Sequence, residues 1–100
     1  MTETNTPVVA LLSRPGTWTQ RCDAIRADGS HANPWDPDAV AWCFIGAIYK
    51  CYYSQTLKFK EVIPVIGRVV ERIGPDIESW NDHPDRTIDD VLALARELGI

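Results

Sequence analysis

Residues 36–53, DPDAVAWCFIGAIYKCYY, decide the fold of this 100-residue chain. Asp36 offers an acceptor side chain for a helix N-cap, Pro37 has the fixed φ of a first helical position, and acids flank the proline where they oppose the helix dipole. The pattern predicts a helix that begins there and runs through Tyr53. Because residues 40–48 are apolar on nearly every side, we expect this helix to be buried at the centre of the core. Gly46 would let a neighbour approach it closely.

Three further segments carry helical signals. Thr6 and Pro7 read as an N-cap and a first helical position ahead of the apolar run VVALL, which Pro15-Gly16 ends. Apolar residues repeat at helical spacing over 62–73, where Gly74-Pro75 is a stop signal. A second amphipathic stripe covers 88–98 and is closed by glycine.

A small β-hairpin is predicted near residues 22–32. Its turn signal is Asp28-Gly29, which favours a type I′ turn between the segments CDAIRA and SHA. The fold class is therefore mainly α: a compact bundle of about four helices with this two-stranded hairpin. We expect one domain over residues 1–100, with the first five or so residues flexible.

Composition limits the classes of partner. The formal net charge is −4 and the isoelectric point is near 5.0, and the ten basic residues are dispersed, which argues against nucleic-acid binding. The chain has no apolar run of the length that a membrane span or signal peptide needs, so we expect no membrane partner and a cytoplasmic location. The three cysteines are an odd number, which fits free thiols in a reducing compartment.

The polar stretch WNDHPDRTIDD, residues 80–90, precedes the last predicted helix. Thr87 is a natural N-cap, and Asp90 falls where a capping-box acid reaches back to the cap. We expect Arg86 to pair with Asp82 across the turn and Trp80 to anchor this elbow in the core. The stretch then reads as a helix entrance, with a solvent-facing histidine at position 83.

Catalytic chemistry has little support in the residue pattern. Cys43, His83 and an orienting Asn81 or Asp82 are the residue types of a cysteine hydrolase. However, the predicted central helix places Cys43 about two turns from its start, where burial raises a thiol pKa, so a core cysteine is the better interpretation. No ligand spacing for a metal and no glycine-rich phosphate loop occurs, so no metal site and no cofactor are predicted.

Trp18 and Gln20 lie on an irregular segment, where an aromatic side chain with polar neighbours either lines a pocket or plugs the core. If they line a pocket, the candidate ligand or partner site is a cleft between residues 18–20 and 80–82, with polar groups from Gln20, Asn81 and Asp82. Trp35, just before the predicted N-cap, is expected to contact Val40 in a hydrophobic staple.

Four stretches taken in order resemble a known family: WTQ at 18–20, RADG at 26–29, DPDAVAWCFIGAI at 36–48 and WNDHPDRTIDDVLAL at 80–94. The family comprises small bacterial proteins of unknown function, found also in actinobacterial phages, with a Trp-Cys pair in a central helix and a Trp-Asn-Asp-x-Pro-x-Arg-Thr elbow. The resemblance runs from about Trp18 to Leu98. It implies an accessory bacterial or phage role without an assigned activity.

Three functional hypotheses follow. The first is a non-enzymatic interaction or regulatory module with an unknown protein partner, because no catalytic set is assembled. The second is a small enzyme or ligand binder that uses the 18–20 and 80–82 cleft. The third is a homodimer with an aromatic seam of Tyr49, Tyr52 and Tyr53.

Overall fold

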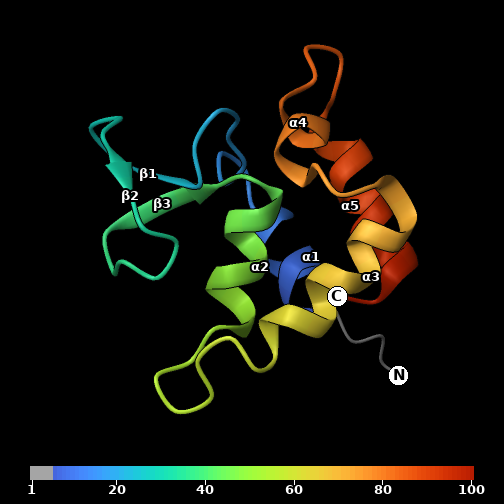
Figure 1. Cartoon of the computed structure of the whole chain (residues 1–100). Helices are drawn as coiled ribbons and strands as arrows, with labels where there is room; N and C mark the ends of the chain where they lie inside the picture. The colour runs from blue at the N-terminus through green and yellow to red at the C-terminus, as the bar shows by residue number, and fades with distance from the viewer. Residues whose placement is uncertain (1–5) are drawn as a thin grey trace, which may run out of the picture.

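The computed structural model describes residues 6–100, which form five helices and one three-stranded sheet (Figure 1). The five residues that we expected to be flexible lie outside the described residues. In chain order the elements are α1 (Pro7–Leu12), β1 (Ala24–Arg26), β2 (His31–Ala32), β3 (Ala39–Trp42), α2 (Phe44–Tyr52), α3 (Val62–Ile73), α4 (Ile77–Asp82) and α5 (Ile88–Leu98). The mainly helical class is confirmed, with one helix and one strand more than the sequence predicts.

Local sequence signals place the start of α1, the end of α3 and both ends of α5, although α1 ends at Leu12, before Pro15, and the Thr6 hydroxyl makes no cap hydrogen bond. Pro7 opens α1, and Gly74 ends α3 with a φ of +97° that a side chain would disfavour. At α5 the capping box is present: the Thr87 hydroxyl accepts from the backbone N–H of Asp90, and the Asp90 carboxylate accepts from the backbone N–H of Thr87. These helix boundaries depend on contacts within one turn, which explains why sequence finds them.

The predicted start of the central helix is wrong. Asp36 and Pro37 lie in a turn closed by the backbone N–H of Ala39, which donates to the Asp36 carbonyl at 3.1 Å. The chain then forms β3, and α2 begins only after Cys43, which is its N-cap residue. Proline at the second position of a β-turn needs the same φ as proline at the first position of a helix, so this local signal fits both.

The hydrophobic staple expected of Trp35 and Val40 has no helix start to close, because Val40 lies in β3, where its side chain is 44% exposed. Trp35 packs instead on Tyr49 and Tyr53 of the α2 end, with ring centroids 6.3 and 5.0 Å away. A residue expected to staple the helix start therefore contacts the helix C-terminus.

The hairpin is confirmed and is extended by a third strand. The sheet has the order β2-β1-β3 and is antiparallel, with Ala24 opposite both Ala32 and Trp42. The turn is not type I′, since Gly29 has a positive φ of +88° and Asp28 does not. The Gly29 N–H donates to the Arg26 carbonyl at 2.9 Å, which gives a type I turn followed by a left-handed glycine.

The elbow contains α4, a helix that the sequence analysis missed. The Asp76 side chain caps it by accepting from the backbone N–H of Ser79 at 2.9 Å. The core combines buried residues of all five helices with Ala24, Ala39 and Trp42 of the sheet. In Figure 1 the sheet lies beside α2, and α3, α4 and α5 lie on the other side of that helix.

Gly46 allows the close contact that we expected of it. An added Cβ there would lie 1.9 Å from the carbonyl oxygen of Asp23, on the segment leading into β1. This places the start of α2 directly against residues 22–23 and fixes the geometry of the region described next.

Candidate functional site

Asn81 is the centre of a buried hydrogen-bond network between α4, α2 and the segment before β1. Its side chain is 0% exposed. Its Oδ1 accepts from the Trp18 indole Nε1–H at 2.7 Å and from the backbone N–H of Phe44 at 3.0 Å. Its Nδ2 donates to the Thr19 carbonyl at 3.2 Å and to Asp82 Oδ1 at 3.0 Å. All four hydrogen-bonding positions of the amide are therefore used within the protein.

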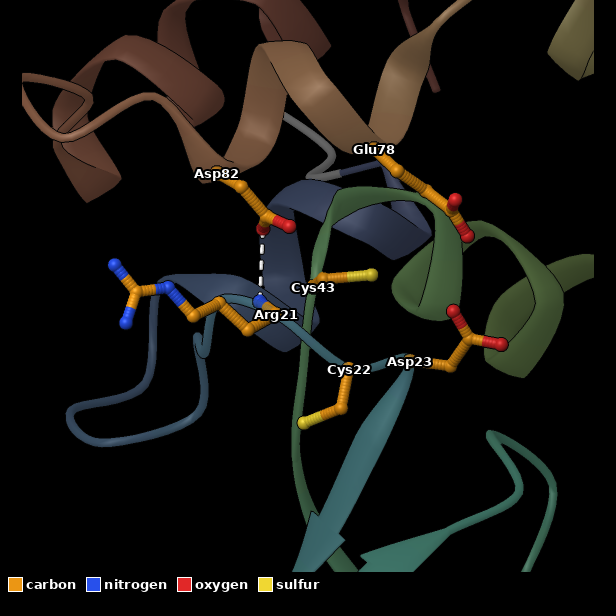
Figure 2. Close-up of a pocket in the computed structure, with 6 residues that line it drawn as sticks. All are labelled: Arg21, Cys22, Asp23, Cys43, Glu78 and Asp82. Carbon is orange, nitrogen blue, oxygen red and sulfur yellow. Dashed lines mark hydrogen bonds between the residues drawn. The ribbon is translucent and has the colours of Figure 1, made fainter.

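Gln20 and Asp82 complete the connection between residues 18–21 and 81–83. Gln20 Nε2 donates to the carbonyls of Asn81 and His83, at 2.8 and 3.1 Å. Asp82 Oδ1 also accepts from the backbone N–H of Arg21 at 2.8 Å (Figure 2). The structure thus brings together all four residues that sequence nominated, namely Trp18, Gln20, Asn81 and Asp82. Their binding of a ligand or partner stays a prediction.

Arg86 does not pair with Asp82 as the sequence analysis expected. Its Nε donates to the Trp80 carbonyl at 2.8 Å, and its guanidinium carbon lies 3.9 Å from the centroid of the Trp80 ring. A planar guanidinium stacks well on an indole ring, and this contact is more favourable than an exposed ion pair with Asp82 would be. Trp80 also contacts Phe44, with a centroid distance of 5.8 Å, so it anchors α4 on the core as predicted.

His83 follows α4 and is exposed, as expected. Its Nδ1 accepts from the backbone N–H of Asp85 at 3.1 Å. Cys43 lines the pocket described next, whereas His83 does not, so the structure does not assemble the thiol and imidazole of a cysteine hydrolase.

A small pocket opens beside this network (Figure 2). Its volume is about 120 Å³, and its lining residues are Arg21, Cys22, Asp23, Cys43, Glu78 and Asp82. In Figure 2 the guanidinium of Arg21 points away from the other side chains, so the groups that face inward are mainly acids and a thiol. Among residues 6–100, no group of three or more His, Cys, Asp or Glu side chains is placed to hold a metal ion.

The three thiols are free, as predicted, and their environment keeps them protonated. Burial raises the pKa of Cys43 to about 12, although its sulfur accepts the Gly46 N–H at 3.3 Å. Burial likewise raises the pKa of Cys51 to about 11 and also raises the pKa of Cys22. The conclusion that Cys43 is a core cysteine holds, but it lies at a helix start and not two turns inside the helix.

Sequence missed the pocket residues Cys22, Asp23 and Glu78. Glu78 and Asp82 are four residues apart, a spacing that places both on one face of α4. The spacing of Glu78 and Asp82 predicts a shared face only if residues 77–82 are first predicted to be a helix.

A second feature is an aromatic cluster on the surface near the end of α2. Tyr49 and Tyr53 each contact Trp35 on one side and Phe59 on the other, with the Phe59 centroid 6.0 and 5.1 Å away. Trp35 and Phe59 are each 44% exposed, whereas the tyrosines are half-buried. We call Trp35, Tyr49, Tyr53 and Phe59 the aromatic face. Tyr52, the third tyrosine of the seam predicted for a homodimer, takes no part in these ring contacts; like Tyr49 and Tyr53 it is half-buried and packs against the core.

The loop between α2 and α3 is built to hold Phe59 outward. Leu57 N–H donates to the Ser54 hydroxyl at 2.9 Å, and Lys58 N–H donates to the Ser54 carbonyl at 2.8 Å. Lys58 has a left-handed φ of 54°, which is uncommon for a residue with a side chain. Leu57, next along the loop, is 39% exposed. Such an ordered loop presents its apolar side chains in a fixed place.

The fold and site define a small, mainly α domain with a buried polar network around Asn81 and a surface cluster of aromatic rings that includes the exposed Trp35 and Phe59. The chain belongs to DUF6197, a family of unknown function, whose model matches residues 6–98. Neither the curated proteins nor the solved structures include a significant match to the chain. No helix among residues 6–100 is both long enough and apolar enough to cross a membrane.

Proposed function

We propose that this chain is a non-enzymatic protein–protein interaction module that binds its partner through the aromatic face. The observation that carries the proposal is the contact of four aromatic rings on the surface, two of them 44% exposed. Single exposed apolar residues are normal, but contiguous ones mark interaction sites. Trp and Tyr are also the residue types most enriched at interface hot spots.

The role that fits this module is that of an accessory protein of bacterial or phage origin. The resemblance of the four sequence stretches supports that origin. Three unpaired thiols support a cytoplasmic location, since such thiols persist in a reducing compartment. The partner is either a different protein or a second copy of this chain.

The alternative function, a ligand binder or small enzyme, has weaker support. Asn81 has no hydrogen-bonding capacity left for a ligand. The pocket beside Asp82 holds about 120 Å³, and a second one, lined by Trp18, Ile88 and Leu92 among others, holds about 270 Å³, whereas ligand sites typically enclose about 300 to 1,000 Å³. Two thiols line the pocket beside Asp82: Cys43 has a pKa of about 12, and the pKa of Cys22 is also raised by burial, so neither supplies much thiolate at neutral pH.

Photo-crosslinking tests the interaction module. A photoreactive phenylalanine analogue replaces Phe59 in one variant and Val40 in the control, which is equally exposed at 44% but lies on β3 and is not part of the aromatic face. Irradiation in an extract of the source cells is expected to give a discrete adduct from position 59 and none from position 40. The same adducts from both positions, or no adduct from position 59, would contradict the proposal.

A further inference from the structure

The charges around the aromatic face narrow the class of partner. Residues 39–60 contain no Asp or Glu and include all three lysines of the chain, Lys50, Lys58 and Lys60. The remaining residues contain seven arginines and all fourteen acids. A stretch of charge +3 therefore stands within a chain whose remainder carries −7, which together give the net −4.

Lys58 and Lys60 are free to meet an external charge, whereas Lys50 Nζ lies 5.9 Å from the centroid of the Trp42 ring. All three are exposed. The ion pairs among residues 6–100 involve Arg26 and Arg72 as their cations, so none of the three lysines has a carboxylate partner there. Lys58 and Lys60 flank Phe59 directly, in the loop sequence Leu-Lys-Phe-Lys. Basic and apolar groups thus alternate on the loop that holds Phe59 outward.

The acids nearest Trp35 do not cancel this charge. Asp36 and Asp38 are both held by Arg26, at N–O distances of 3.2 and 2.9 Å. Arg26 offsets one of these two carboxylates, so this group keeps a net charge of −1 on the Trp35 side, and the exposed Glu61 follows Lys60 directly. The two lysines that flank Phe59 therefore outnumber the one acid beside them. An approaching group therefore meets an apolar surface whose border is positive on the Phe59 side, at Lys58 and Lys60.

From this complementarity we infer that the aromatic face binds an acidic peptide segment with apolar side chains, a partner class that rests on the proposed interaction function. Apolar side chains of the segment pack on the rings of Trp35 and Phe59. Its carboxylates meet Lys58 and Lys60, which fixes its register and speeds its approach. A nucleic acid would be a poorer occupant, because three lysines neutralise few phosphates and the rest of the chain repels a polyanion.

Selection from a displayed library of short random peptides tests the inference. Peptides enriched on the wild-type chain and lost on Phe59→Ser are expected to be net acidic and to contain aliphatic or aromatic residues. The double variant Lys58→Glu/Lys60→Glu should weaken these peptides roughly tenfold or more, and added salt should weaken them on the wild type. The matched control Arg14→Glu/Arg68→Glu, which changes the net charge equally at two other exposed sites, should have a far smaller effect.

The possible failures are distinguishable. Enrichment of neutral or basic peptides that depend on Phe59 would overturn the acidic partner and leave the interaction function standing. Phe59-dependent self-association in analytical ultracentrifugation, or Phe59-dependent binding of a single-stranded oligonucleotide, would overturn it in favour of a second copy or a nucleic acid. If no ligand depends on Phe59, although Phe59→Ser melts like the wild type, both proposals fail.

Discussion

Replacing Asn81 with alanine is expected to destabilise the fold severely. The change removes the partner of three groups outside α4: the Trp18 indole N–H, the Phe44 backbone N–H and the Thr19 carbonyl. Each polar group left without a partner in a buried site costs about 1 to 3 kcal/mol. A water molecule that enters the space of the missing amide would recover part of this loss.

We therefore expect Asn81→Ala to lower the free energy of unfolding by about 3 to 5 kcal/mol. For a domain of this size that corresponds to a fall in melting temperature of about 15 to 30 °C. Urea unfolding followed by tryptophan fluorescence and by circular dichroism measures the change. The matched control is Asn33→Ala, an exposed asparagine, for which we expect a change within about 0.5 kcal/mol.

An isosteric variant separates hydrogen bonding from packing. Asn81→Asp keeps the acceptor for Trp18 and Phe44 but loses the donor to Thr19 and adds a charge beside Asp82. Burial and that neighbour would raise the pKa of the new carboxyl in the folded state, so the variant should approach wild-type stability as pH falls and the carboxyl is protonated. A loss below about 1 kcal/mol for Asn81→Ala would refute the view of this residue as the organising centre.

Three further predictions rest on local geometry. Gly46→Ala should lower the free energy of unfolding by about 2 to 4 kcal/mol, because its Cβ would overlap the Asp23 carbonyl. The control Gly67→Ala, in a helix with nothing within 4 Å of the added Cβ, should raise it by about 0.5 to 1 kcal/mol. Equal effects of the two variants in the same urea titration would contradict this account. Iodoacetamide at pH 8 should label Cys22 before Cys43 in the native chain, since the pKa of Cys43 is about 12, and mass spectrometry would detect the reverse order. Hydrogen bonds from the Ser79 backbone N–H and, to a lesser degree, from the Ser79 hydroxyl lower the pKa of Asp76 in the folded state. The charged Asp76 therefore contributes stability above the unfolded pKa of about 3.9, and this contribution is lost as pH falls through the lower folded pKa. The stability difference between wild type and Asp76→Asn should therefore shrink below about pH 4, and a constant difference would exclude this role.

Sequence predicted the parts of the fold that depend on neighbours along the chain. The capping box of Thr87 and Asp90 lies within one turn, and Gly46 is apolar, small and set in a buried run, so both are readable from local pattern. The start of α2 was not readable in this way. Whether Pro37 opens a helix or a turn is decided by the pairing of β3 with β1, in which Trp42 lies opposite Ala24.

The candidate site shows the same division. The residue types predicted that Trp18 and Asn81 line the same site. They did not predict which atoms bond, because Asn81 meets the Trp18 side chain and the Thr19 carbonyl across about sixty positions of sequence. Only two of the four residues of the aromatic face could be grouped from the sequence. Tyr49 and Tyr53 share a helix face by spacing, whereas Trp35 and Phe59 reach them through a turn and a loop whose shapes have no simple sequence signal.

The large sequence separation of the residues in the Asn81 network has a consequence for folding during translation. Trp18, Thr19 and Gln20 leave the ribosome about sixty residues before their partners at positions 81 and 83. Closing such a loop has an entropic cost that local helices do not share. We expect residues 18–20 to lack their native partners until residues 81–83 have been synthesised, so that docking of α4 follows the formation of the local elements between them.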